Sequence, residues 1–151
     1  MYTKINEKDS AMKLGAIYSK EKTTFTLFSP VADSVFVIFY DKGNDSAETG
    51  RLEMVRGEGE LRSIFSATAE GNLDGVYYTY EAHTSDGTFS SHDPYARACG
   101  VNGHRSMVID LSKTDPDGFA DEDRPKLADP MSMVITEVSI VDVSAGASAH
   151  S

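Results

Sequence analysis

Short apolar runs separated by turn-forming residues restrict this chain to an all-β fold. About eight such runs recur along the chain, and clusters of Gly, Pro, Asn, Asp and Ser lie between them. Helical periodicity is nearly absent, and the runs have the length and spacing of strands in a sandwich. We therefore predict a β-sandwich of about seven to eight strands. The runs cover residues 14–19, 23–29, 34–40, 51–56, 61–67, 75–84, 88–91 and 105–111.

Two of these runs predict the centre of the core. Ser34–Tyr40 is continuously apolar and rich in β-branched and aromatic residues, which indicates a central strand covered on both faces. Gly75–Thr84 alternates, so Tyr78 and Tyr80 point to one face of the sheet and the residues between them to the other. Asp86-Gly87 then predicts a hairpin turn, after which the chain returns as another strand.

Composition excludes several classes of function. The net charge of −10 repels phosphate backbones and anionic lipid, so we expect neither nucleic acid nor membrane as a partner. The single cysteine, Cys99, cannot form an intramolecular disulfide and is expected to be buried or idle. Met1–Ser10 has no apolar region typical of a signal peptide, and no run is long enough to span a bilayer. We therefore expect a cytoplasmic location.

No residue pattern predicts catalysis, a metal or a cofactor. The four histidines are widely spaced, and no nucleophile elbow of the Gly-x-Ser-x-Gly type occurs. The acidic run Asp115–Asp123 offers oxygen ligands for calcium, but it lacks the order of an EF-hand loop. A solvated linker is the simpler interpretation of that run. We expect no catalytic residues, no metal site and no cofactor in this chain.

Aromatic side chains form the one candidate ligand surface. Sugar rings stack their apolar faces on flat side chains, so Tyr77, Phe89 and Tyr95 are candidate carbohydrate-binding residues. The alternative is that these aromatic residues pack within or between the sheets, which is their commoner role in a sandwich.

The C-terminal part of the chain has a different composition. Residues 113–131 are rich in Asp, Pro, Lys and Glu and predict a linker, and 145–151 predict a flexible tail. Between them, Met133–Val143 is a second apolar run with high β-propensity and no proline. We expect this run to seek a sheet edge, either in the chain's own sandwich or by self-association with another copy. The predicted organisation is thus an extension (1–13), a sandwich module (14–112), a linker (113–131), one further strand (132–144) and a tail (145–151).

Several segments, taken in order, resemble a known module. Asp93-Pro94-Tyr95-Ala96-Arg97-Ala98 resembles the junction in the carbohydrate-binding module family 48 domain that precedes the barrel of type I pullulanases, in glycoside hydrolase family 13. Four further segments resemble strands of that module, namely Leu14–Ser19, Thr24–Ala32, Gly75–Glu81 and Arg105–Leu111. The resemblance implies an immunoglobulin-like β-sandwich. Val134–Ile140 is similar to the first strand of the family's (β/α)₈ barrel, which implies that the chain is truncated and that this strand is an orphan.

The resemblance also carries expectations about function. The family's catalytic carboxylates lie on later barrel strands, so none maps onto this chain and the chain alone is not expected to be an enzyme. We expect a noncatalytic module of a pullulanase-like α-1,6-glucan debranching enzyme that mainly braces the catalytic barrel, its expected partner. Alternatively, the module binds α-glucan such as glycogen or starch itself, or is a stand-alone immunoglobulin-like interaction protein. Glycogen-binding relatives stack sugars on tryptophans beside a lysine; here Phe89 stands near one tryptophan position, Glu81 near the lysine, and Trp is absent.

Overall fold

The computed structural model describes residues 13–123 and 126–140, and the chain divides into two compact units with a boundary between Thr114 and Asp115. The first unit is built of strands, as predicted, and its connections include short 3₁₀ turns. The strands are β1 (Gly15–Tyr18), β2 (Lys22–Phe28), β3 (Ser34–Tyr40), β4 (Glu48–Arg56), β5 (Ile64–Glu70), β6 (Tyr77–Thr84), β7 (Gly87–Ser91) and β8 (Ser106–Met107). The 3₁₀ turns of both units are η2 (Gly59–Leu61), η3 (Val101–Gly103), η4 (Leu111–Lys113), η5 (Phe119–Asp121) and η6 (Pro130–Ser132).

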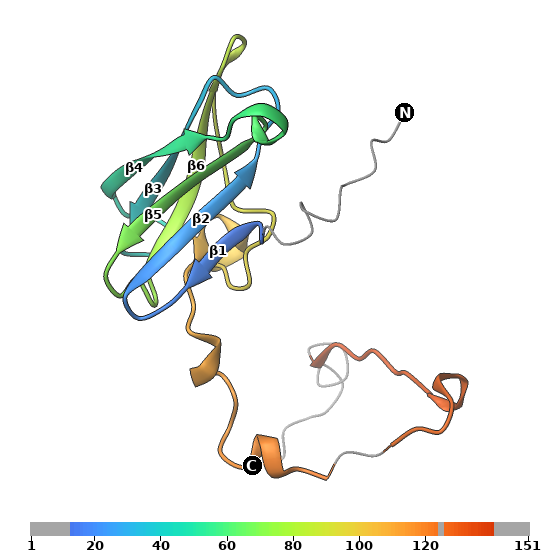
Figure 1. Cartoon of the computed structure of the whole chain (residues 1–151). Helices are drawn as coiled ribbons and strands as arrows, with labels where there is room; N and C mark the ends of the chain where they lie inside the picture. Colours follow the sequence, from blue (N-terminus) through green and yellow to red (C-terminus); the bar gives the residue numbers. More distant parts are fainter. Residues whose placement is uncertain (1–12, 124–125, 141–151) are drawn as a thin grey trace. The chain divides into compact units, whose positions relative to one another are not determined.

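All strand pairs are antiparallel, and their order is β1-β2-β5-β4-β3-β6-β7, with β8 beside β6. Strand β4 joins the two layers of the sandwich (Figure 1). Most of β4 pairs with β3, but its last residues pair with β5 through Val55↔Ser66 and Arg56↔Phe65. One layer therefore contains β1, β2 and β5, and the other contains β3, β6, β7 and β8.

The core lies between these layers. Phe25 of β2 is fully buried, and its ring centroid lies 5.0 Å from that of Tyr78 on β6, so the two layers meet edge to face. As predicted, Tyr78 and Tyr80 of β6 are both buried in the core, although Thr79 between them is also buried on the opposite face. The other buried apolar members of the core cluster are Leu27, Ala32, Val35, Val37, Met54, Phe65 and Val108.

The prediction that β3 is covered on both faces is also confirmed. Val35 and Val37 point into the core, and Ile38 on the opposite face is only 2% exposed. Side chains of the first unit contribute to the cover of this outer face. The guanidinium of Arg105 lies 3.6 Å from the centroid of the Tyr40 ring.

The expected strand 61–67 is shifted to β5, because Leu61 lies in the 3₁₀ turn η2. Two further strand predictions differ from the structure. The expected strand Arg105–Leu111 is shortened to β8, because the chain turns into η4 at Leu111 and the Asp110 carboxylate caps that turn by accepting from the Ser112 amide. Met133–Val143 was expected as a strand, but residues 133–140 form none, and 141–143 lie outside the described residues. A strand exists only with a hydrogen-bonded neighbour, and high β-propensity does not supply one.

Two further observations concern partners and reactivity. No helix in the described residues has the length and apolar character needed to cross a bilayer. Cys99 is free and exposed, so of the two predicted alternatives, a buried thiol or an idle one, burial is wrong. Cys99 bridges to Ser106 through the backbone alone, which leaves its side chain at the surface.

Candidate functional site

The three predicted carbohydrate-binding residues do not form one platform. Phe89 on β7 is 56% exposed and lies opposite Ala82 of β6. Because Phe89 and Ala82 are directly opposite, their side chains lie on the same face of the sheet. Tyr77 is an odd number of residues from Ala82 on the same strand, so the side chain of Tyr77 points to the other face. Tyr95 is 47% exposed, and it lies in the junction against Gly15 of β1. The structure thus places the three rings at three separate positions.

The ring of Tyr77 packs against the loop that follows β3. A Cβ added to Gly43 would lie 3.0 Å from Cε1 of Tyr77, so the loop backbone closely approaches that ring. Arg105 holds the same loop by donating to the carbonyl oxygens of Lys42 at 2.6 Å and Ser46 at 2.9 Å. The guanidinium also covers one face of the Tyr40 ring. These contacts give both tyrosines a packing role.

A polar and aromatic cluster occupies the outer face of β3, β4 and β6. We call Phe36, Arg51, Glu81 and His83 the outer-face cluster. The Glu81 carboxylate lies 3.0 Å from Nε2 of His83 and 3.5 Å from Nη1 of Arg51. The His83 and Phe36 rings meet edge to face at 5.4 Å, and Arg51 lies 5.9 Å from the Phe36 ring centroid. The cluster combines an apolar ring with hydrogen-bonding groups, which is the chemistry that a sugar requires.

Of this cluster, the sequence pointed only to Glu81 in connection with sugar. Phe36, Arg51 and His83 lie on three different strands, and only the strand register brings them together. No signal within β3 pointed to Phe36, because a continuous apolar run does not show which of its side chains face outward.

The junction, Asp93–Ala98, contains a buried carboxylate whose two oxygens both accept hydrogen bonds from other residues of the sandwich. Asp93 is 2% exposed, and its Oδ2 accepts hydrogen bonds from the hydroxyls of Tyr78 at 2.7 Å and Tyr80 at 3.3 Å. Its Oδ1 accepts from the amide of Tyr95 at 2.8 Å, and its own amide donates to Oγ of Ser106 at 2.8 Å. Burial, followed by the negative charge of Asp93, raises the pKa of both tyrosine hydroxyls. The junction therefore locks β6 and β8 together.

Gly15 allows the junction to sit directly on β1. Its φ is +90°, which favours glycine, and an added Cβ would lie 2.9 Å from the Cβ of Tyr95. The junction motif is thus a structural closure of the sandwich, and its carboxylate has no access to a substrate.

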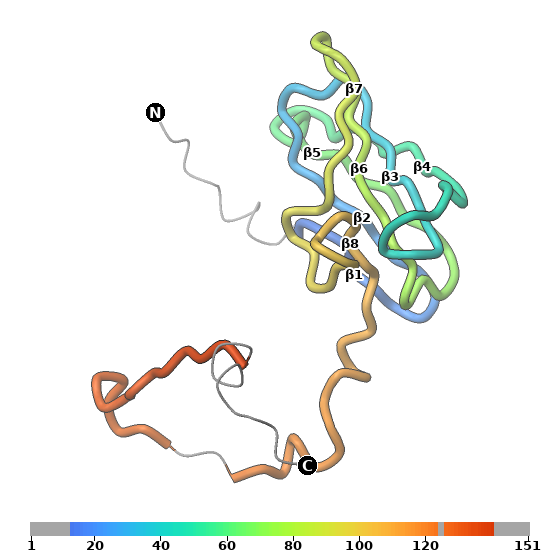
Figure 2. Tube along the Cα trace, turned by 180° about the vertical axis from the view of Figure 1, so that it is seen from behind, coloured from blue at the N-terminus to red at the C-terminus, as the bar shows by residue number. Residues whose placement is uncertain are grey.

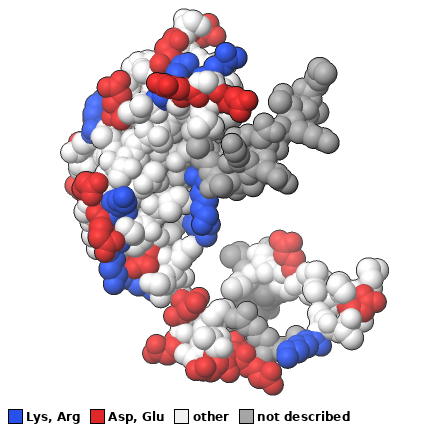
Figure 3. All heavy atoms as spheres, in the orientation of Figure 1, with Lys and Arg blue, Asp and Glu red and all other residues white. Residues whose placement is uncertain are grey.

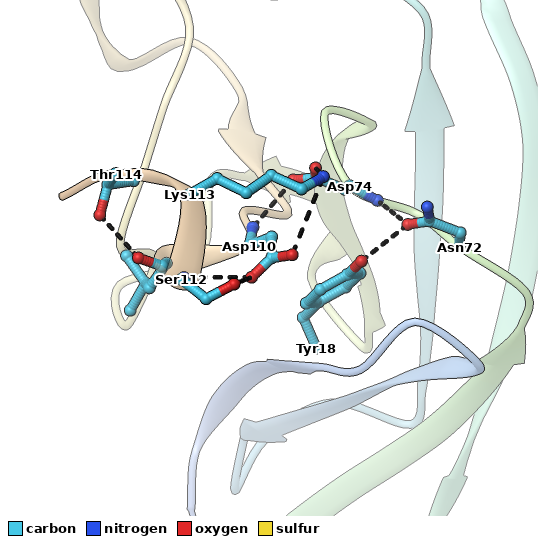
Figure 4. A network of polar contacts seen from close by, with 8 residues as sticks. Tyr18, Asn72, Asp74, Asp110, Ser112, Lys113 and Thr114 are labelled. Carbon is cyan, nitrogen blue, oxygen red and sulfur yellow. Dashed lines mark hydrogen bonds and ion pairs between the residues drawn. The ribbon is translucent and has the colours of Figure 1, made fainter. Parts of the chain in front are cut away.

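A second polar network fixes the point where the chain leaves the sandwich (Figure 4). Oδ1 of Asp74 accepts from the amide of Asp110 at 2.8 Å, and its Oδ2 accepts from Nζ of Lys113 at 2.6 Å. Nearby, the hydroxyl of Tyr18 on β1 donates to the side-chain oxygen of Asn72 at 2.9 Å. We call this the exit network. The hydrogen bond between Asp74 and Lys113 lowers the pKa of Asp74. The hydrogen bond between Asp110 and Ser112 lowers the pKa of Asp110.

The exit network predicts a loss of stability in acid. The pKa of Asp74 is lower in the folded chain than in the unfolded chain, so the unfolded chain binds more protons as the pH falls. Asp74 therefore stabilises the fold at neutral pH, and this contribution disappears as the carboxylate is protonated. We expect the stability of Asp74→Asn to decrease less than that of the wild type as the pH falls. The measurement is the urea midpoint from neutral pH to about pH 3. Lys113→Met should show the same smaller decrease, and a wild-type slope in both variants would contradict the prediction.

An open groove lies beside the exit network. It has a volume of about 300 Å³ and is lined by both apolar and charged residues. Ile17 is 38% exposed and Leu111 is 43% exposed, so two large apolar side chains of this groove face solvent. We call it the exit groove. Its other lining residues include Lys13, Ala16, Ala96, Arg97 and Met107.

The neighbouring outer face of β1, β2 and β5 carries few charges. Figure 3 shows this face as a largely uncharged expanse with acidic and basic side chains around its rim. Strand register places Thr24 opposite both Ile17 and Thr68, and Phe28 opposite Ile64, on this face. On a chain with a net charge of −10, an uncharged face beside an apolar groove is a surface suited to contact with another folded domain.

The described residues show no arrangement for binding a metal. Within 13–123 and 126–140, no three His, Cys, Asp or Glu side chains gather closely enough to hold an ion. The acidic side chains of Asp115–Asp123 are exposed.

Comparison with known proteins agrees with this architecture. The family model described as carbohydrate-binding module 48, the isoamylase N-terminal domain, matches residues 13–96. Pullulanase A of Streptococcus pneumoniae serotype 4 is 31% identical over 116 residues, which cover 72% of this chain and 9% of the enzyme. A pullulanase of Bacillus subtilis is 30% identical over 98 residues, which cover 64% of this chain and 13% of that protein.

Solved structures give the same result. The pullulanase from Bacillus acidopullulyticus superposes with a TM-score of 0.71 at 34% identity, covering 78% of this chain and 14% of that one. The pullulanase from Paenibacillus barengoltzii, solved with maltohexaose and alpha-cyclodextrin, gives a TM-score of 0.72 at 33% identity, covering 78% of this chain and 18% of that one. This chain therefore spans only a small part of the length of the pullulanases that it matches.

The resemblance inferred from the junction and the strand segments is thus confirmed at the level of sequence and of fold. The chain belongs to the carbohydrate-binding module 48 family, the isoamylase N-terminal domain.

Proposed function

We propose that this chain is a noncatalytic N-terminal module of a pullulanase-like enzyme that hydrolyses α-1,6 branches in glucans, and that it mainly braces the catalytic barrel. The support from similarity is that the relatives are pullulanases and that the matched region is a small share of each. The noncatalytic role is supported by the buried carboxylate of Asp93, because that carboxylate already accepts hydrogen bonds from two tyrosine hydroxyls and a backbone amide.

The exit groove is the observation that carries the bracing role. It lies where the chain leaves the sandwich, and Ile17 and Leu111 expose apolar surface there. A domain that follows in the chain is tethered beside this groove, and the entropy of closing the intervening linker grows only slowly with its length. The exit network strengthens this geometry, because Lys113 and Asp110 hold the departing backbone against Asp74.

We expect charged substitutions in the exit groove to weaken the support of a barrel. In a chimera, residues 13–114 would replace the matched segment of the Bacillus acidopullulyticus pullulanase, and the half-life of pullulan hydrolysis would be measured during heating. Ile17→Asp and Leu111→Asp should shorten that half-life several-fold relative to the unsubstituted chimera, because each places an unpaired charge in an apolar contact.

Val101→Asp is the matched control, since Val101 is 56% exposed and does not line the exit groove. The bracing role through this groove is wrong if the groove substitutions shorten the half-life no more than Val101→Asp does.

The second candidate is that the module binds α-glucan itself. Two observations favour it: the outer-face cluster presents Phe36 among hydrogen-bonding groups, and Phe89 exposes an aromatic ring on the neighbouring strand. The two sites do not share a face of the sheet. Phe89 lies on the same face as its partner Ala82, whereas the neighbouring residue Glu81, which belongs to the outer-face cluster, points to the other face. The two aromatic sites therefore do not form one platform.

Affinity electrophoresis separates the two functions. If bracing is the main role, the migration of the chain through a gel containing glycogen or soluble starch should equal its migration through a plain gel. If the module binds glucan through the predicted aromatic ring, the chain should be retarded and Phe89→Ala should remove the retardation. Retardation that survives Phe89→Ala but is lost in Phe36→Ala would assign binding to the outer-face cluster and exclude Phe89.

A further inference from the structure

Two cations line the exit groove without an opposing charge. The groove lies between β1 and β8, which Figure 2 shows side by side where the chain leaves the sandwich. Lys13 and Arg97 belong to the lining, and both are exposed. Among the residues that the structure describes, neither side chain has an ion pair or a hydrogen bond. The groove is therefore a local positive site on a chain whose net charge is −10.

The carboxylate that lines the same groove does not neutralise them. Within the described residues, Asp110 carries the only carboxylate of the lining, and it is 7% exposed. Its Oδ1 accepts from the amide of Ser112 at 3.1 Å and from the hydroxyl of Ser112 at 2.6 Å. Its Oδ2 lies 3.8 Å from Nζ of Lys113. Both oxygens of Asp110 thus belong to the exit network, and the guanidinium of Arg97 is left without an anion.

The backbone on both sides of Arg97 is fixed. The amide of Ala96 donates to the carbonyl oxygen of Asp93 at 3.1 Å. The carbonyl oxygen of Ala98 accepts from the amide of Met107 on β8 at 2.8 Å. Arg97 therefore projects from an ordered turn, and a partner that binds it has only the side chain left to order.

The other described arginines show what the fold ordinarily does with a guanidinium. Arg51, Arg56 and Arg105 contact a carboxylate, an aromatic ring and backbone carbonyls, respectively. Arg62, which follows η2, is exposed and has no side-chain partner among the described residues, but it does not line the exit groove. Arg97 is thus held in a groove without a role in the sandwich, and Arg62 provides a matched control.

We propose that the exit groove receives a carboxylate of the domain that follows in the chain, and that Arg97 binds this carboxylate through paired N–H donors. The inference rests on the proposed function, because it names the group by which the braced domain is held. Ile17 and Leu111 expose apolar surface in the same groove, so the complementary surface carries an acidic side chain between apolar ones. Lys13 adds a second positive charge to the groove, which favours an anion further.

The chimera described above tests this ion pair through the half-life of pullulan hydrolysis during heating. Arg97→Met keeps a long apolar stem and removes the charge, so it should shorten the half-life at least about threefold. Arg97→Lys keeps the charge but loses the planar fork, so its half-life should lie between those of Arg97→Met and the unsubstituted chimera. Arg62→Met removes an equally exposed guanidinium outside the groove and should leave the half-life unchanged.

The 151-residue chain separates docking from folding. Arg97→Met and Arg97→Lys should unfold at the wild-type urea concentration, because the guanidinium has no ion pair or hydrogen bond within the described sandwich. A fall in the urea midpoint that accounts for the shorter half-life would place Arg97 among the residues that stabilise the sandwich, and would overturn the proposed carboxylate.

The groove substitutions distinguish a failure of this inference from a failure of the proposed function. Suppose that Ile17→Asp shortens the half-life more than Val101→Asp does, but that Arg97→Met behaves like Arg62→Met, or that Arg97→Lys survives no longer than Arg97→Met. The groove then braces the barrel without binding a carboxylate, and only this inference is overturned. If Ile17→Asp and Leu111→Asp do no more than Val101→Asp, the bracing role is wrong and this inference is wrong with it.

Discussion

Asp93→Ala is expected to lower the free energy of unfolding by about 3 kcal/mol or more. The substitution removes the acceptor of two buried hydroxyls and of the Tyr95 amide, all held by one carboxylate that is 2% exposed. Tyr78 and Tyr80 lie in the core, so water cannot replace that acceptor without opening the sandwich. Urea denaturation followed by tyrosine fluorescence measures the loss.

Asp93→Asn is the matched control for this prediction. An asparagine keeps the shape of the side chain and one acceptor oxygen, so it should lose less stability than alanine does. If Asp93→Ala unfolded at the wild-type urea concentration with an unchanged slope, the hydrogen bonds of Asp93 would not hold the junction, and its role as the closure of the sandwich would be wrong.

Phe25→Ala should destabilise the chain by about 3 to 5 kcal/mol. Phe25 is fully buried between the two layers, and its ring meets those of Tyr78 at 5.0 Å and Phe39 at 5.7 Å. Removal of the ring leaves a cavity that strands held by hydrogen bonds cannot close. The midpoint of thermal or urea unfolding checks this expectation.

Phe28→Ala provides the comparison on the same strand. Phe28 is 53% exposed on the outer face of β2, so its truncation removes little buried surface and should cost less than about 1 kcal/mol. Equal losses in the two variants would mean that β2 does not separate a core face from an outer face, and would contradict the sandwich register.

The strands and much of the core are predictable because their signals are local. The alternation of Gly75–Thr84 predicts that Tyr78 and Tyr80 share the core side, and both side chains are buried. The apolar run Ser34–Tyr40 predicts a strand with the bounds that β3 has. In each case a pattern within a single segment decides the result.

The candidate site is less predictable because it depends on register between strands. Tyr77 and Phe89 belong to strands that pair, but the pairing of Phe89 with Ala82 turns the two rings to opposite faces. Arg51 and His83 meet at Glu81 only because β4 and β6 flank β3. No spacing within one segment of the sequence encodes either outcome.

Residues 133–140 show a different limit of sequence patterns. Their apolar and β-branched composition predicts a strand, but the segment forms none in the single chain. β-Propensity reports how well side chains fit a pleated, half-buried surface, so its effect depends on a neighbouring strand. The pattern therefore indicates only a capacity for pairing with a neighbouring strand.

The role of this chain as a noncatalytic module is tested most directly by its action on pullulan. The purified 151-residue chain, confirmed as folded by its urea transition, would be incubated with pullulan and the release of reducing ends followed over time. We expect no release above that of a heat-denatured sample at any concentration of the chain. Release that rises in proportion to the concentration of the folded chain would contradict the proposed function.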